Sequence, residues 1–62
     1  GRERPDVQER MVIRFAHRVG RPFTLRDLSD RSPLNAEQAS LTVNTMLERG
    51  HLRREGEGYA LP

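Results

Sequence analysis

The stretch that decides the fold is residues 46–54, which reads Met-Leu-Glu-Arg-Gly-His-Leu-Arg-Arg. Its glycine follows an apolar helical stretch and a basic residue, an order typical of a helix end. After it come Glu55-Gly56-Glu57-Gly58 and Tyr59-Ala60-Leu61. Two strand-like runs around a tetrapeptide that contains glycines predict a β-hairpin. We therefore expect the last helix of the chain to lead directly into a hairpin.

Three helices are predicted before this hairpin, each from a capping pair followed by apolar residues at helical spacing. The capping pairs are Asp6 with Glu9, Thr24 with Asp27, and Asn35 with Gln38. The helices expected from them cover residues 6–19, 25–31 and 36–49, and glycines end the first and the third. Between the first two, residues 21–24 are expected to form an extended connector, because proline disfavours helix at the residue before it.

The expected core collects the apolar residues on one side of each element, and Ala36 is expected to join the buried stripe of the third helix. The predicted core is Val12, Phe15, Ala16, Val19, Leu25, Leu28, Leu34, Ala39, Val43, Met46, Leu47, Leu52, Tyr59 and Leu61. Residues 1–5 are expected to be a disordered lead-in or linker. Residues 6–62 are expected to form one domain, since 62 residues leave room for one modest core. The first residue is Gly1 rather than Met, which indicates an excised domain or a residue left by cloning.

Several kinds of site are disfavoured by the composition. The chain has no cysteine, which removes disulfides and thiolate metal sites. Neither His17 nor His51 has a second histidine three or four positions away, so we expect no metal and no cofactor. No serine has an evident base partner, and we expect neither an enzyme nor a small-molecule site. No apolar run approaches the ~20 residues that span a bilayer, so no membrane partner is expected.

All 11 basic residues are arginines, and they are unevenly distributed. Residues 1–31 hold eight arginines and five acids, a net charge of +3, whereas residues 32–62 hold three arginines and four acids, a net charge of −1. Arg10, Arg14 and Arg18 form a stripe on the outer side of the first helix. Such a stripe is most often simply solvated, although it could also contact nucleic acid, a second copy or an acidic membrane surface.

The order of helix, connector, helix, tight turn, helix and hairpin resembles the winged helix-turn-helix family. The resemblance covers residues 11–61 and rests on residues 23–29 (Phe-Thr-Leu-Arg-Asp-Leu-Ser), the turn at 33–35 (Pro-Leu-Asn) and residues 46–54. It implies a mainly α domain of three helices with a small β-hairpin, the wing. It also implies a cytoplasmic DNA-binding module of a prokaryote-type transcription regulator, usually dimeric. In that family the third helix lies in the major groove of double-stranded DNA.

The candidate contact residues come from this resemblance and from a helical projection centred on Val43. Three side chains of the third helix are expected to face bases: Gln38, Leu41 and Thr45. Six residues on the second helix, the third helix and the wing are expected to hold phosphates: Arg26, Arg31, Asn35, Ser40, Arg53 and Arg54.

Acidic residues keep a second interpretation open. Glu37 and Glu48 lie at the edge of the outward face, and that helix carries no arginine before its end, so it neutralises little phosphate charge. At the wing tip, Glu55 and Glu57 are expected to pair across the hairpin with the two wing arginines. The alternative function is therefore a winged-helix protein–protein interaction or dimerisation module that uses the exposed Leu41 face.

Overall fold

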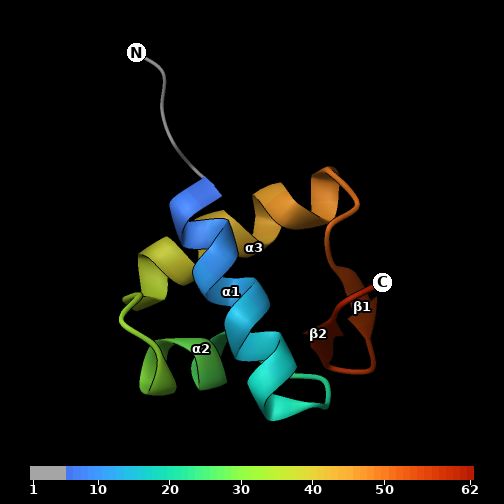
Figure 1. The fold of residues 1–62 in the computed structure, drawn as a ribbon, viewed down its shortest axis with the longest axis horizontal. Coiled ribbons are helices and arrows are strands. Elements are labelled where there is room, and N and C mark those ends of the chain that lie inside the picture. The colour runs from blue at the N-terminus through green and yellow to red at the C-terminus, as the bar shows by residue number, and fades with distance from the viewer. Residues whose placement is uncertain (1–5) are drawn as a thin grey trace.

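The computed structural model describes residues 6–62 of the chain (Figure 1). It contains α1 (Asp6–Val19), α2 (Leu25–Arg31), α3 (Ala36–Glu48) and an antiparallel hairpin of β1 (Arg53–Glu55) and β2 (Gly58–Ala60). The predicted class, mainly helical with a small hairpin, is confirmed. Figure 1 shows α1 in front of α3, α2 near one end of α3 and the hairpin near the other. No helix within residues 6–62 is long and apolar enough to cross a membrane.

Local hydrogen bonds set the start of α2 and α3. The Thr24 hydroxyl accepts a bond from the Asp27 N–H, and the Asp27 carboxylate accepts one from the Thr24 N–H, both at 3.1 Å. Asn35 and Gln38 form the same reciprocal pair, at 2.8 and 3.1 Å. Two of the three predicted capping boxes are therefore confirmed. The prediction of an Asp6 cap, like the lead-in over 1–5, lies outside the residues and side chains that the structure describes.

The end of α3 is a Schellman motif that turns the chain into the hairpin. The helix ends at Glu48, one residue before the predicted end, and Arg49 is its C-cap. Gly50, the next residue, has a φ of 77°. The Gly50 N–H donates to the Leu47 carbonyl at 3.2 Å, and the His51 N–H donates to the Met46 carbonyl at 2.8 Å. These two bonds satisfy carbonyls that the helix leaves unpaired, and the left-handed φ is one that glycine adopts without strain.

The core agrees with most of the predicted set. The buried apolar residues are Val12, Phe15, Ala16, Phe23, Leu28, Leu34, Ala39, Val43, Met46 and Leu52. The other predicted members, Val19, Leu25, Leu47, Tyr59 and Leu61, are partly buried against it, as are Met11 and Ile13. The prediction for Ala36 is wrong, because this residue is exposed. Its direction around α3 is that of the core, but it lies in the first turn, beyond the part of the helix that is covered.

Phe23, absent from the predicted core, is among its most buried residues, with 1% of its surface exposed. Its backbone pairs with Tyr59: the Phe23 N–H donates to the Tyr59 carbonyl at 2.9 Å, and the Tyr59 N–H donates to the Phe23 carbonyl at 2.7 Å. Its ring meets the Phe15 ring edge-on, with centroids 5.4 Å apart. The connector therefore joins the hairpin to α1. A single aromatic residue after a proline carries no periodicity that would predict this.

Candidate functional site

The outer surface of α3 is the candidate DNA-contacting face. Gln38 and Leu41 are exposed, as predicted, and Leu41 keeps 62% of its surface accessible. The buried residues of α3 are Ala39, Thr42, Val43 and Met46, which places the centre of the buried side between Val43 and Thr42. The exposed line opposite is consequently rotated from the predicted one. It consists of Glu37, Leu41, Asn44 and Glu48, with Gln38 also exposed.

The packing of α1 against α3 explains why the exposed line of α3 differs from the predicted one. The Thr42 hydroxyl donates to the Gln8 side-chain carbonyl at 3.0 Å, so the first turns of α1 cover that flank of α3. Thr45 lies on the same flank, half-buried at a shallow depression of about 100 Å³ that Gln8 and Leu41 also line. Asn44 therefore occupies the exposed position that the helical projection gave to Thr45.

A buried carboxylate ties α1 to the junction between α3 and the hairpin. The Glu9 side chain is only 8% exposed, and its Oε2 lies 3.5 Å from Nη1 of Arg49. Its Oε1 lies 3.5 Å from Nδ1 of His51. Residues about 40 positions apart in the chain meet here, and no local sequence pattern predicts such a contact. Arg49 is thereby directed toward α1 rather than toward the exposed line of α3.

The charged residues of the hairpin pair differently from the prediction. The register of the hairpin places Ala60 opposite Arg53 and Gly58 opposite Glu55. Neither charged residue therefore faces an oppositely charged side chain on the other strand. That prediction is wrong. Arg53 and Glu55 instead share one face of β1 and pair with each other at 2.7 Å. Arg54 lies on the other face, with its guanidinium carbon 5.7 Å from the centre of the Tyr59 ring, a cation–π geometry.

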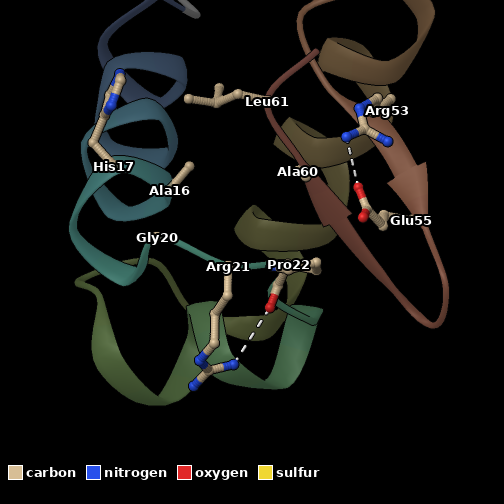
Figure 2. Close-up of a pocket in the computed structure, with 9 residues that line it drawn as sticks. All are labelled: Ala16, His17, Gly20, Arg21, Pro22, Arg53, Glu55, Ala60 and Leu61. Carbon is tan, nitrogen blue, oxygen red and sulfur yellow. Dashed lines mark hydrogen bonds and ion pairs between the residues drawn. The ribbon is translucent and has the colours of Figure 1, made fainter.

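A depression of about 380 Å³ lies between the end of α1, the connector and the hairpin, and Figure 2 shows the residues that line it. It is lined by Ala16, His17, Gly20, Arg21, Pro22, Arg53, Glu55, Ala60 and Leu61. The Arg53–Glu55 pair occupies its hairpin side, while the Arg21 side chain points away from the hairpin and donates to the Pro22 carbonyl at 3.4 Å. The arrangement holds no nucleophile beside a base. Over residues 6–62 no group of three or more His, Cys, Asp or Glu could hold a metal ion.

The six predicted phosphate contacts come from α2, the start of α3 and β1. Arg31 lines a depression together with Arg14 and Arg18 of α1, and Arg53 faces the end of α1. Arg26 is exposed on α2, 4.0 Å from Asp30. The remaining three lie at the start of α3 or on β1: Asn35 and Arg54, which are exposed, and Ser40, which is half-buried.

Comparisons with protein-family models, with curated proteins and with solved structures give no match to this chain. The winged helix-turn-helix resemblance therefore continues to rest on the residues and element order described above. Because one fold can carry many functions, the function has to be argued from the side chains on its surface.

Proposed function

We propose that the domain binds double-stranded DNA through α3, as the DNA-binding module of a transcription regulator. The observation that carries the proposal is the exposed face of α3, where two amide side chains, Gln38 and Asn44, lie on either side of Leu41. An amide can pair with both N6 and N7 of adenine, and an aliphatic side chain can contact the thymine methyl group. The exposed face of α3 has no arginine, the usual partner of guanine. We therefore expect A·T pairs at the centre of the site.

The capping box at the start of α3 is compatible with this role. The Gln38 Oε1 accepts a bond from the Asn35 N–H, which uses one of its two lone pairs and leaves the NH₂ group available. The remaining N–H groups of the first turn and the positive end of the helix dipole favour a phosphate. Gln38 can thus contact a base while it holds the end of the helix in place.

Few charges support binding, so the affinity should be modest and sensitive to salt. Arg54 on the hairpin is exposed and stacks on Tyr59, and Arg26 on α2 has only a long, exposed contact of 4.0 Å with Asp30, so these two arginines remain able to contact phosphates. Arg53 is paired with Glu55 at 2.7 Å, and Arg31 of α2 lies beside Arg14 and Arg18 of α1. With two phosphates neutralised, the plot of log K against log salt should have a slope of about −2. Glu37 and Glu48 repel phosphates and lower the affinity further.

The test is a fluorescence anisotropy titration with two duplexes, one with an A·T-rich core and one with a G·C-rich core. The A·T duplex should bind more tightly, and Asn44→Ala should reduce that preference by about fivefold or more, the value of one lost bidentate contact. Arg54→Ala should weaken binding to both duplexes equally and lower the salt slope by about one.

The matched control is Arg10→Ala, which removes the same charge from an exposed position on α1. It should leave binding to both duplexes unchanged. Equal losses from Arg10→Ala and Arg54→Ala, together with no effect of Asn44→Ala, would show that the attraction is nonspecific and would overturn the proposal.

A protein contact at the same face is the second candidate, favoured by the 62% exposure of Leu41 between the carboxylates of Glu37 and Glu48. Val7 and Leu41 are the exposed large hydrophobic residues of the described chain. If this candidate is right, Leu41→Glu should abolish self-association or partner binding in analytical ultracentrifugation, and duplex DNA should not bind. If the DNA proposal is right, the same variant should instead lose affinity for the A·T-rich duplex.

A further inference from the structure

A second surface lies between α1 and α2, and of its residues only Arg31 belongs to the predicted phosphate contacts. Two adjoining depressions of about 200 and 300 Å³ share Phe15, Arg18 and Arg31 and so form one continuous groove. Its floor is apolar and includes Met11, Phe15 and Val19. Its rim carries four arginines, Arg14, Arg18, Arg21 and Arg31. We call this surface the arginine groove.

The rim arginines come from three separate segments: Arg14 and Arg18 from α1, Arg21 from the connector, and Arg31 from the last turn of α2. Among the residues that the structure describes, no Asp or Glu lines the groove. In the part of the chain that the structure describes, the ion pairs involve other arginines and His51, and none joins a carboxylate to a rim arginine within 4.0 Å. Arg18 and Arg31 lie in the last turns of α1 and α2, where a positive charge interacts favourably with the helix dipole. This effect explains each of the two residues but not four positive charges around one apolar floor.

From this combination we infer that the arginine groove docks an acidic segment of a partner protein that also carries apolar side chains. A guanidinium group offers a planar pair of donors that matches a carboxylate. The four rim arginines can therefore hold carboxylates on both sides of the groove. Apolar side chains of the same segment then cover the exposed parts of Met11 and Val19, which are only half-buried in the domain.

Other anionic partners fit this surface less well. A DNA backbone would satisfy the rim arginines but has no protruding apolar side chain that could enter the groove and cover the floor. A membrane surface is bound by apolar side chains that protrude, and the exposed large hydrophobic residues of the described chain, Val7 and Leu41, do not line the groove. The acidic protein segment is the partner that uses both the charge of the rim and the apolar floor.

The probe for the test is a short fluorescein-labelled peptide in which Glu and Asp alternate with Leu and Phe, titrated with the 62-residue chain at low and at physiological salt. Binding should saturate, weaken with salt and shift the amide resonances of Arg18, Val19 and Arg31 but not those of Leu41 or Asn44. Arg18→Gln and Arg31→Gln should each weaken binding by about threefold to fivefold, the range of an exposed ion pair.

Arg10→Gln is the matched control, because Arg10 belongs to the same stripe on α1 but does not line the groove. It should leave peptide binding unchanged. A peptide with Ala in place of Leu and Phe should bind at least about fivefold more weakly, since it cannot cover the floor. Circular dichroism spectra that match those of the unchanged chain would show that the variants remain folded.

Four results would overturn the inference. The first is an equal loss from Arg10→Gln, and the second is equal binding of the Ala peptide, because either would show that charge alone drives the association. The third is a stronger shift of the Arg18 and Arg31 resonances by a short duplex or by anionic vesicles at the same salt. The fourth is concentration-dependent shifting of those resonances without peptide, which would make a second copy the occupant. None of these results depends on whether α3 binds DNA.

Discussion

The substitution Gly58→Ala tests whether the contact between the connector and the hairpin holds the hairpin in place. A Cβ atom at this position would lie 2.6 Å from the Phe23 carbonyl oxygen and 3.1 Å from its carbon. Both atoms belong to the backbone, and the Phe23 side chain is buried, so neither can move aside without separating the two segments. The φ of Gly58 is not positive, and alanine therefore brings no conformational penalty of its own.

Separation of the segments would break the two hydrogen bonds between Phe23 and Tyr59, of 2.9 and 2.7 Å. At about 0.5–1.5 kcal/mol for each bond, the free energy of unfolding should fall by about 1–3 kcal/mol. The total stability of a chain this short is about 3–9 kcal/mol, so the loss is a large part of it. With a compatible backbone and no clash, Gly→Ala would instead stabilise by about 0.4–1 kcal/mol through the unfolded state. The two expectations differ in sign.

Urea unfolding followed by circular dichroism measures the change, and amide hydrogen exchange of Phe23 and Tyr59 locates it. Both amides should exchange faster in Gly58→Ala than the loss of global stability alone requires. The control is Gly56→Ala, at a φ of 62° and with open space around the added Cβ, which should lower stability through the backbone conformation alone. A Gly58→Ala variant as stable as the unchanged chain, or more stable, would refute this reasoning.

Three further predictions concern single side chains. Glu9→Gln leaves Arg49 and His51 without their shared carboxylate, and urea unfolding should show a free energy of unfolding lower by about 1 kcal/mol. A change of under about 0.5 kcal/mol in either direction is what a surface carboxylate without such partners would give, and it would contradict this prediction. Asn35→Ala removes the acceptor of the Gln38 N–H and should cost about 1 kcal/mol by thermal unfolding; an unchanged Tm would mean that the cap contributes nothing. Glu48→Gln removes a carboxylate from the exposed line of α3 and should raise DNA affinity about twofold at low salt in anisotropy titrations. An unchanged affinity would mean that the duplex does not bind near this end of α3.

Several predicted features depend on residues close together in the chain. The capping boxes join Thr24 to Asp27 and Asn35 to Gln38, three positions apart, and the bonds that end α3 span three to five positions. Such contacts form as soon as the local backbone is helical, so residue types at fixed spacing predict them. Apolar spacing likewise predicted that Val12, Val43 and Met46 are buried, because the period of the helix is set by its own hydrogen bonds.

The candidate site was only partly predictable for a related reason. A helical projection gives the direction of a side chain but not which flank a neighbouring helix covers. The bond from Thr42 to Gln8 of α1 therefore moved Asn44, rather than Thr45, onto the exposed line. Hairpin register in turn decided that Arg53 pairs along its own strand with Glu55.

The sequence by itself determined the helices, their ends, the hairpin and the uneven distribution of arginines. Tertiary structure alone decided that Phe23 is buried and pairs with Tyr59, that the Glu9 carboxylate lies between Arg49 and His51, and that arginines from three segments surround one apolar groove. The physical reason is the separation along the chain. Local hydrogen bonds and helical period are encoded over a few residues, whereas these contacts join segments that meet only when the helices pack around the shared core.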